Sequence, residues 1–336
     1  MAQHTRILIA ESEGFSPLAL GILSGLGSVK LADADSRQLR FLAADADVLW
    51  VRLRNHIDAT LMDAAPRLRI IASPTTGLNH IDTAEAALRG IRVISLRDAR
   101  EFLQGVRATA EHTIGLMLAL LRSIPASVRH VRYGGWNRDL FKGRELYGKT
   151  IGVVGYGRLG RIVARYLRAF EACVLASDPH VNEPELEDGV RLVPLHELLQ
   201  SADIISVHVS LNPGTMNLFG REQFASMRPG SWFINTSRGE IVDENALLDA
   251  LRTGRLAGAA VDVVAGEHES GRIRSPLITY ARRHNNLIVT PHCGGCTAES
   301  MEKTEIYLAQ QVAATLGSET YADGLTLTAG SVSGGM

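Results

Sequence analysis

A short apolar segment followed by three closely spaced glycines constrains the fold of this chain more than any other feature. The β-branched segment Ile151–Val154 reads as a buried strand, and after it come Gly155, Gly157 and Gly160, followed by a helical pattern over Arg161–Phe170. The first glycine allows a tight turn, the second lets the backbone approach a phosphate, and the third lets the helix pack closely on the sheet. The N-terminus of that helix also presents N–H groups and a positive dipole end. The segment therefore predicts a strand–turn–helix unit that binds the pyrophosphate of a dinucleotide.

An acidic residue ends the next predicted strand, Val174–Ser177. This residue, Asp178, lies at the spacing expected for a carboxylate that accepts hydrogen bonds from the adenosine ribose. A carboxylate there repels a 2′-phosphate, so the position favours NAD over NADP. The structural alternative is a loop carboxylate that precedes Pro179.

Short apolar runs alternate with helical patterns along the whole chain, which predicts parallel sheets covered by helices on both faces. A length of 336 residues and two such series indicate two α/β domains. The predicted strands of the first series are Arg6–Ala10, Val29–Leu31, Val48–Val51, Ile70–Ala72 and Val93–Ile94. Those of the second are Ile151–Val154, Val174–Ser177, Ile204–His208, Trp232–Asn235, Ala259–Val263 and Leu287–Val289.

Four helical patterns accompany these strands. Asp58–Ala64 and Thr83–Arg89 lie between strands of the first series, and Ser300–Leu316 has helical spacing before a small, polar tail that is expected to be irregular. Glu111–Arg122 is apolar nearly all round. Periodicity does not decide whether that helix is buried in the core or between two subunits.

Composition narrows the class of protein. Hydrophobic residues make up 46% and charged residues 21%, which suits a globular fold. The net charge is -1, so no charge excess favours nucleic acid or an anionic membrane. The chain starts without an apolar leader, and its longest apolar stretch, Ile114–Leu121, is too short to span a bilayer. With only three cysteines, the expectation is a cytoplasmic protein with reduced thiols.

Three segments of the second half resemble the signature segments of the D-isomer-specific 2-hydroxyacid dehydrogenases, in particular the phosphoglycerate dehydrogenases. They are Asn235–Glu244, Ala257–Val263 and Thr290–His292, with Gly148–Thr150 and Arg228–Gly230 as supporting motifs. The resemblance implies a Rossmann-type cofactor domain, residues 99–292, inserted into a flavodoxin-like substrate domain, residues 1–98 and 293–336. Both are expected to be doubly wound parallel sheets, and no regulatory domain is expected after residue 320.

The resemblance also implies roles for individual residues. It places the catalytic residues at Arg238, Glu267 and His292, and the substrate contacts in the loop Thr76, Gly77 and Leu78, whose backbone N–H groups could cradle a carboxylate. It implies contacts to NAD from Gly155, Gly157, Arg158, Leu159, Gly160, Asp178, His208, Thr215, Thr236, Asp262 and Gly294. Asp262 would hold the nicotinamide carboxamide, and no metal ligand is implied.

The three catalytic residue types suit the chemistry of an alcohol–ketone exchange. Oxidation removes a hydride from carbon and a proton from oxygen, and histidine accepts protons near neutral pH. A carboxylate on its other nitrogen stabilises the imidazolium, and a guanidinium binds the substrate carboxylate and polarises the C2 carbonyl. Taken singly, a histidine after proline or an arginine before glycine is often structural. Together they predict an oxidoreductase that transfers a hydride between NAD and C2 of a D-2-hydroxy acid.

The chain departs from the family pattern in three places. The segment between Glu267 and His292 is longer than expected, with His268 in place of a proline and an apparent insertion at Ser270–Arg274. The loop over 73–82 keeps only part of the expected glycine-rich pattern. Cys293 and Cys296 have C-x-x-C spacing, but a zinc ribbon would need a second pair, so small-residue packing is the preferred interpretation.

Substrate, assembly and two other functions stay open. Arg52 and Arg54 follow a predicted strand and alternate onto one side, which suggests a fork for a phosphate or second carboxylate, as in 3-phosphoglycerate; each could instead pair with a surface carboxylate. Glu111–Arg122 and Ser123–Trp136 are expected to form a homodimer. The alternatives are a non-catalytic, NAD-sensing corepressor-like scaffold and a dehydrogenase for glyoxylate or hydroxypyruvate. Formate dehydrogenases of this family carry Gln where Glu267 stands, which argues against formate.

Overall fold

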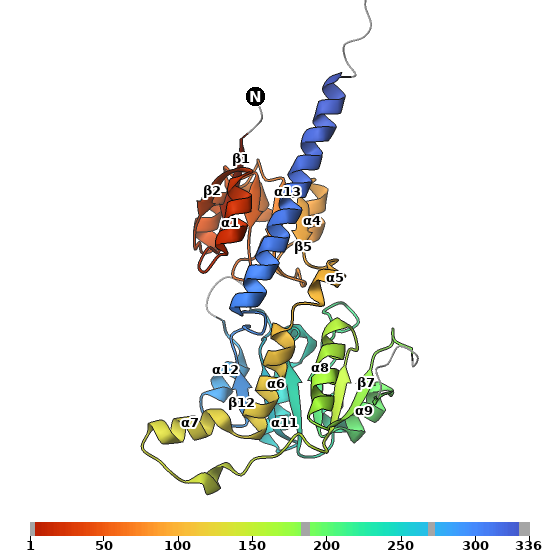
Figure 1. The fold of residues 1–336 in the computed structure, drawn as a ribbon. Coiled ribbons are helices and arrows are strands. Elements are labelled where there is room, and N and C mark those ends of the chain that lie inside the picture. The colour runs from red at the N-terminus through yellow and green to blue at the C-terminus, as the bar shows by residue number, and fades with distance from the viewer. Residues whose placement is uncertain (1–3, 183–188, 268–272, 329–336) are drawn as a thin grey trace, which may run out of the picture. The chain divides into compact units, whose positions relative to one another are not determined.

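The computed structural model describes residues 4–182, 189–267 and 273–328, and these divide into two units (Figure 1). The first unit takes Met1–Gly105 and Ala298–Met336, and the second takes Val106–Glu267 and Gly271–Thr297. The second unit is thus inserted into the first, as the resemblance implies. The chain passes between the units at 105/106 and 297/298, whereas the sequence places the domain boundaries at 98/99 and 292/293.

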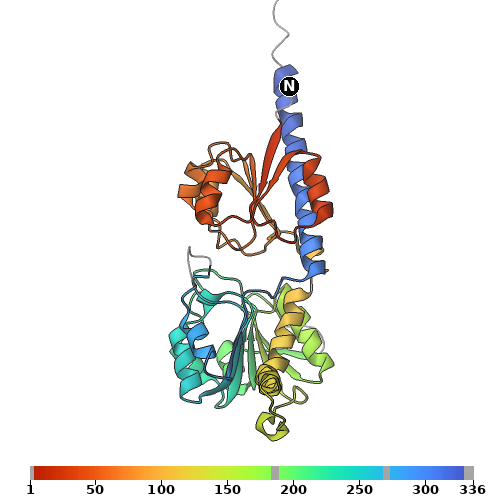
Figure 2. The same cartoon turned by 90° about the vertical axis from the view of Figure 1, so that its left-hand side faces the viewer.

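The first unit is built on a five-stranded parallel sheet in the order β2-β1-β3-β4-β5, which confirms the flavodoxin-like prediction. Its elements are β1 (Thr5–Ile9), α1 (Pro17–Ser24), β2 (Gly27–Leu31), α2 (Ser36–Ala43), β3 (Val48–Trp50), α3 (Ala59–Asp63), β4 (Ile70–Ser73), α4 (Thr83–Leu88), β5 (Arg92–Ser95), α5 (Arg100–Leu103) and α13 (Ala298–Thr328). Because side chains alternate along a strand, Ile7 and Ile9 pack toward α1 and α13, and Leu8 packs toward α2–α4. Figure 2 shows these helices on the two faces of the sheet.

The second unit contains a seven-stranded parallel sheet in the order β12-β11-β10-β9-β6-β7-β8. Its elements are α6 (Ala108–Leu121), α7 (Ile124–Arg132), η1 (Arg138–Phe141), β6 (Thr150–Val154), α8 (Arg158–Ala169), β7 (Cys173–Ser177), β8 (Val190–Leu192), α9 (Leu195–Ser201), β9 (Ile204–Val207), α10 (Arg221–Ser226), β10 (Ser231–Asn235), η3 (Gly239–Ile241), α11 (Glu244–Arg252), β11 (Leu256–Val261), α12 (Pro276–Ala281) and β12 (Leu287–Val289). The strand order reverses between β6 and β9. Ligands of open α/β sheets bind at such a switch point, outside the carboxyl ends of the strands.

The two faces of this second sheet have separate cores. Val153 and Ile234 pack with α6 and α8, whereas their neighbours Val154 and Phe233 pack with the helices of the opposite face. Helix α6 is therefore mainly a core helix of its own unit: Ala110 and Met117 are fully buried. Of the two possibilities that its periodicity leaves open, the structure shows burial in the core.

Besides shifts of a few residues at strand ends, the predicted elements differ from the structure in one strand and one helix. Strand β8, at the edge of the second sheet, was not predicted, and α13 runs to Thr328 instead of ending at Leu316. Across the described ranges no single helix is both long and apolar enough to cross a membrane. Arg100–Leu121 and Ile124–Arg132 meet the length and hydropathy criterion only as a pair bent by 63°.

Candidate active site

The glycine-rich turn lies at the switch point of the second sheet. Gly155 has φ +91°, a conformation that favours glycine, and a Cβ there would lie 2.8 Å from the carbonyl carbon of His208. A Cβ at Gly160 would lie 2.0 Å from the carbonyl oxygen of Gly155, so the start of α8 packs directly on the turn. Gly157 is different, because a Cβ there would meet nothing within 4 Å. The space beside the N-terminus of α8 is therefore open.

His208, which follows β9 on the other side of the switch point, is partly buried. Its Nε2 lies 2.8 Å from Ser206 Oγ, and its buried Nδ1 atom has no hydrogen-bond partner among the described residues. Burial lowers the pKa of His208 to about 3, so the ring is neutral at physiological pH. A buried polar nitrogen without a partner costs free energy, which is a reason to expect a ligand group there.

Asp178, at the end of β7, is held by the glycine-rich turn. Its carboxylate accepts hydrogen bonds from the backbone N–H of Tyr156 and of His180, both at 2.9 Å. The acid therefore lies against the turn that the pyrophosphate would occupy, in the register that the sequence predicts. Nearby, Arg158 donates to the carbonyl oxygen of Val106, and burial, with a smaller effect from Arg107, lowers its pKa.

Arg238 lies in the turn after β10, and Asn235 holds that turn together. The Asn235 side chain accepts from the N–H and hydroxyl of Ser237 and donates to the carbonyl oxygen of Arg238 at 2.9 Å. The turn also packs tightly on the segment after β11, because a Cβ at Gly239 would lie 2.0 Å from the carbonyl carbon of Val264. Burial lowers the pKa of Arg238, while the charges of Glu267 and Glu240 oppose that shift. The guanidinium remains a cation.

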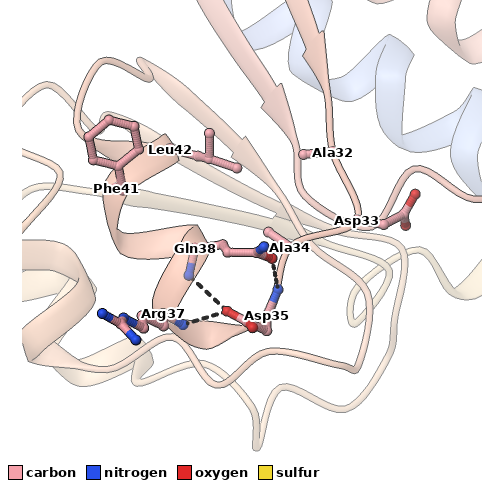
Figure 3. Close-up of a pocket in the computed structure, with 8 residues that line it drawn as sticks. All are labelled: Ala32, Asp33, Ala34, Asp35, Arg37, Gln38, Phe41 and Leu42. Carbon is pink, nitrogen blue, oxygen red and sulfur yellow. Dashed lines mark hydrogen bonds between the residues drawn. The ribbon is translucent and has the colours of Figure 1, made fainter.

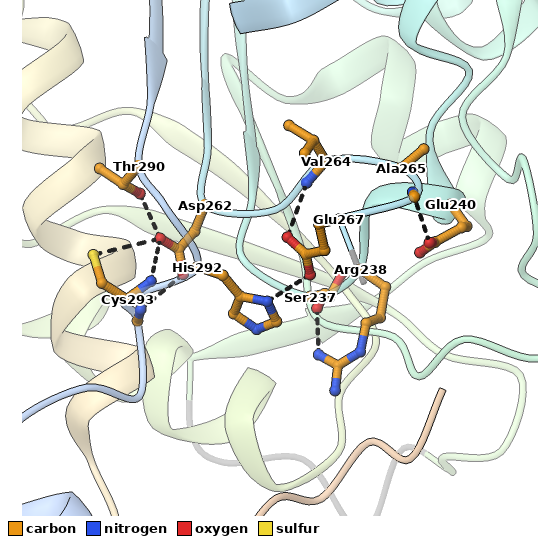
Figure 4. Close-up of polar contacts among 12 residues, drawn as sticks. Ser237, Arg238, Glu240, Asp262, Val264, Ala265, Glu267, Thr290, His292 and Cys293 are labelled. Atoms are coloured by element: carbon orange, nitrogen blue, oxygen red, sulfur yellow. Dashed lines mark hydrogen bonds and ion pairs between the residues drawn. The ribbon is translucent and has the colours of Figure 1, made fainter. Parts of the chain in front are cut away.

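His292 and Glu267 form a short contact at the centre of the predicted catalytic residues (Figure 4). His292 Nδ1 lies 2.5 Å from Glu267 Oε1, and the second carboxylate oxygen accepts from the backbone N–H of Val264 at 3.4 Å. This contact fixes the orientation of the imidazole ring through Nδ1. His292 also has φ +51°, a left-handed backbone that is uncommon outside glycine and that clusters at functional sites.

Asp262 fixes the backbone around His292. This buried carboxylate, 1% exposed, accepts from the N–H groups of Cys293 at 3.0 Å and Gly294 at 2.7 Å, and from Thr290 Oγ1 at 2.5 Å. Its own carbonyl oxygen accepts from the N–H of His292 at 2.7 Å. In this structure Asp262 therefore holds the left-handed turn in place. A contact with the nicotinamide carboxamide, as the resemblance implies, stays a prediction.

The sequence analysis did not single out three residues that support this network. His112 Nε2, on α6, lies 3.2 Å from Asp262 Oδ1 and 3.1 Å from Thr290 Oγ1, and Asn235 holds the Arg238 turn. Thr290 and Asn235 lie inside the quoted motifs, whereas nothing in the local pattern of Glu111–Arg122 connects His112 with Asp262.

Two predicted NAD contacts also have partners within the fold. Thr236 Oγ1 lies 2.8 Å from Thr113 Oγ1, and Thr215 Oγ1 donates to the carbonyl oxygen of Ser210.

The predicted arginine fork is not formed. Arg52 bonds Glu305 of α13 through Nε at 3.1 Å and Nη2 at 2.5 Å, and donates to the carbonyl oxygen of Glu13 through Nη1 at 2.8 Å. Arg54 instead faces Asp33 at 3.5 Å. The two guanidiniums thus have different partners. Arg52 anchors α13 to the first unit, because Glu305 is 1% exposed and needs a cation.

The predicted carboxylate loop follows β4 in the first unit. Thr75 Oγ1 donates to the carbonyl oxygen of Gly77 at 2.8 Å and lies 3.0 Å from Ser73 Oγ. Ser73 Oγ in turn lies 3.1 Å from Nε2 of the buried His80, and this contact connects the start of the loop to its end. Thr76 is exposed and Leu78 buried. The segment between Glu267 and His292, which departs from the family pattern, is described only in part. His268 and residues 270–272 lie outside the described residues.

A cavity of about 680 Å³ also opens on the first unit, between the end of β2 and α2 (Figure 3). Its lining includes none of the predicted site residues: Ala32, Asp33, Ala34, Asp35, Arg37, Gln38, Phe41 and Leu42. Asp35 serves there as the N-cap of α2, accepting from the N–H groups of Arg37 and Gln38. Helix capping therefore accounts for the Asp35 carboxylate of this cavity.

Comparison with known proteins decides the family. Residues 114–294 match the model of the NAD binding domain of the D-isomer specific 2-hydroxyacid dehydrogenases. The hydroxypyruvate reductase of Thermotoga maritima is 34% identical over 83% of this chain and 88% of its own length. This chain belongs to the D-isomer specific 2-hydroxyacid dehydrogenase family. Its cofactor is NAD, the cofactor of the matched domain.

Two further similarities describe its relatives. The D-3-phosphoglycerate dehydrogenase of Mycobacterium tuberculosis is 36% identical over 97% of this chain, which spans only 60% of the length of that relative. The structure of D-lactate dehydrogenase from Aquifex aeolicus, complexed with NAD and lactic acid, is 27% identical. It superimposes with a TM-score of 0.82, covering 94% of this chain and 97% of the other. Both domains of the fold are therefore shared with proteins of this family.

The residues at the switch point fit NAD. The open space at Gly157 and the N-terminus of α8, which has no capping side chain, suit the pyrophosphate. The buried Nδ1 of His208 offers a nitrogen without a partner, and Asp178 offers a carboxylate for the ribose hydroxyls. The assignments of individual residues to NAD remain proposals.

The charge of Asp178 leads to a prediction on cofactor choice. We expect kcat/KM with NADH to exceed that with NADPH by at least about tenfold, equivalent to about 1.4 kcal/mol, because the carboxylate repels a 2′-phosphate. Asp178→Ala should narrow that ratio, whereas Glu197→Ala, which removes an exposed carboxylate of α9, should leave it unchanged. Equal use of both cofactors by the unaltered protein would show that Asp178 does not select NAD.

Proposed function

We propose that this chain is an NAD-dependent dehydrogenase that interconverts a D-2-hydroxy acid and its 2-oxo acid. The hydrogen-bonded pair of His292 and Glu267 carries the proposal, because a histidine oriented by a carboxylate is a proton donor and acceptor. Arg238 lies on the neighbouring turn of the same unit and keeps a buried positive charge. A chain that only sensed NAD would have no need of this combination.

Each of the three residues has one task in carbonyl reduction. The Arg238 guanidinium binds the substrate carboxylate and draws electron density from the C2 carbonyl oxygen. His292 Nε2 donates a proton to that oxygen, and Glu267 stabilises the imidazolium before the transfer. Bound NADH supplies the hydride to C2. In the reverse direction His292 accepts the hydroxyl proton.

The contact between Glu267 and His292 predicts a change in pH dependence. Reduction requires protonated His292, and a carboxylate beside an imidazole favours the charged form of the ring. Glu267→Gln is therefore expected to move the upper pH limit of kcat/KM for reduction downward. Glu240→Gln is a matched control, since Glu240 also lies near Arg238 but bonds the N–H of Gly266. An unchanged pH profile in Glu267→Gln would remove Glu267 from the proton relay.

The substrate is proposed to be a small 2-oxo acid such as hydroxypyruvate or glyoxylate. The similarity to the hydroxypyruvate reductase supports this class, and the engagement of Arg52 by Glu305 removes the main reason to expect a dianion. A phosphorylated substrate is the second candidate, favoured by the 36% identity with the mycobacterial D-3-phosphoglycerate dehydrogenase. Oxidation of NADH across hydroxypyruvate, glyoxylate, pyruvate and 3-phosphohydroxypyruvate tests both. A much lower KM for the phosphorylated acid would favour the second candidate.

We further propose a homodimer in the cytoplasm, formed through the arm after α6. Helix α7 has no buried residue, and Ile124, Val128 and Val131 are 45%, 46% and 51% exposed along one face, with Tyr133 and Trp136 beyond it. Light scattering at micromolar concentration is expected to give a dimer, and Val128→Glu a monomer, because the charge would have to be buried. A monomeric unaltered protein would contradict this assembly.

A further inference from the structure

A thiol, an imidazole and a carboxylate from three separate elements converge beside the loop that carries His292. His112 lies in α6, Asp262 follows β11, and Cys293 follows His292. One ligand atom from each lies within 4.8 Å of the others. His112 Nε2 is 3.2 Å from Asp262 Oδ1, and Cys293 Sγ is 3.7 Å from the same oxygen. Figure 4 shows the Cys293 thiol directed at the Asp262 carboxylate.

The two separations from Asp262 Oδ1 are close to those between ligands on a tetrahedral ion. Zinc binds nitrogen and oxygen at about 2.0 Å and thiolate sulfur at about 2.3 Å, which places ligand atoms roughly 3.3–3.5 Å apart. The separations of 3.2 and 3.7 Å from Asp262 Oδ1 lie on either side of this range, and the third pair of ligand atoms lies within 4.8 Å. Three protein ligands leave a fourth position open.

We propose that His112, Asp262 and Cys293 form a binding site for a thiophilic divalent cation of the zinc type. The C-x-x-C motif lacks the second cysteine pair that a zinc ribbon requires, but the fold supplies a nitrogen and an oxygen to Cys293 instead. Mixed nitrogen, oxygen and sulfur donors favour zinc-type ions over magnesium or calcium, which prefer oxygen alone. Water occupies the fourth position.

The charges at the site fit such an ion. Asp262 is a buried carboxylate that accepts hydrogen bonds from uncharged groups of the loop. The Cys293 thiol, which carries one proton, lies 3.7 Å from that carboxylate. A divalent cation replaces that proton: the S–H bond breaks, an S–metal bond forms, and one proton passes to solvent. Both anionic ligands then face a positive charge.

Occupation of the site would act on the turn that holds His292. Asp262 Oδ1 accepts from Thr290 and from the N–H of Cys293, and a metal ion at that oxygen competes with both. The left-handed turn would lose part of its support, so reversible inhibition by zinc is expected. This consequence rests on the proposed function, whereas the site itself does not.

Cobalt(II) is the probe, since it takes the same ligands and absorbs light. The full chain is titrated with Co²⁺ without NAD or substrate, and a thiolate-to-cobalt charge-transfer band is expected to saturate at one ion per chain and to be abolished by Zn²⁺. Cys293→Ala should remove the band, and His112→Asn should weaken binding by about tenfold or more. Cys296→Ala and Cys173→Ala are controls that remove exposed thiols and should retain it.

Three outcomes would overturn the proposal. The first is the absence of a charge-transfer band in the unaltered protein, and the second is an unchanged band in Cys293→Ala. The third is loss of the band in Cys296→Ala together with normal affinity in His112→Asn. That third result would place the ion on the cysteine pair. Circular dichroism checks the folding of each variant. If His112→Asn fails to fold, Cys293→Ala still tests the site, because it removes only a partly exposed side chain. NADH oxidation by the same preparations is measured separately, so failure of the metal site is distinguishable from failure of the proposed enzyme.

Discussion

His292→Ala is expected to lower kcat for reduction of a 2-oxo acid by about 10²-fold or more, the scale of lost general acid–base catalysis. The Kd for NADH should stay close to that of the unaltered protein, because the histidine acts on the substrate oxygen. Steady-state NADH oxidation gives kcat, and quenching of protein fluorescence gives the Kd.

The backbone at residue 292 calls for a second variant. Its φ of +51° is strained for alanine and better tolerated by asparagine. His292→Asn should therefore preserve the turn and show the same loss of kcat, while His196→Ala, on the exposed surface of α9, should show none. A kcat within about threefold of normal in His292→Asn would contradict the proton-transfer role.

Arg238→Gln is expected to lower kcat/KM for the 2-oxo acid by about 10²- to 10³-fold. The loss combines charge-assisted binding of the carboxylate with stabilisation of the developing alkoxide. Both a higher KM and a lower kcat are expected, with little change in the Kd for NADH. Arg238→Lys keeps the charge but not the planar fork, so it should recover only part of the loss.

A simple structural role for Arg238 would give a different result. Its guanidinium donates to the carbonyl oxygen of Ser237, so a structural arginine would chiefly change stability. Thermal unfolding of both variants separates these possibilities. An unfolding temperature that falls while kcat/KM per folded molecule stays unchanged would contradict the proposed role.

Much of the fold could be predicted because its signals are local. Buried parallel strands appear as continuous apolar runs, and the glycine-rich turn needs each of its glycines for steric reasons that hold in any sequence. Strand β8 was missed because Val190–Leu192 is a short edge strand in which only Val190 is buried. It has neither the length nor the continuous burial that reveals the other strands.

The partner of Arg52 could not be predicted for a different reason. The strand pattern correctly places it at the carboxyl end of β3, but its partner Glu305 lies on α13, far away in the sequence. No local pattern identifies such a partner. The same holds for His112 and Asp262, which meet only because α6 packs beside β11 and β12. Motifs thus located the catalytic candidates, while the residues that brace them became visible only in three dimensions.

The most direct test of the central claim is the amount and chirality of the product formed per NADH consumed, measured with the 2-oxo acid that turns over fastest. Reduction by the arrangement of Arg238, His292 and NAD proposed here predicts one D-2-hydroxy acid for each NADH oxidised. Binding of NADH without turnover of any 2-oxo acid would contradict the claim and favour a non-catalytic scaffold, and an L-2-hydroxy acid product would contradict the proposed placement of substrate against cofactor.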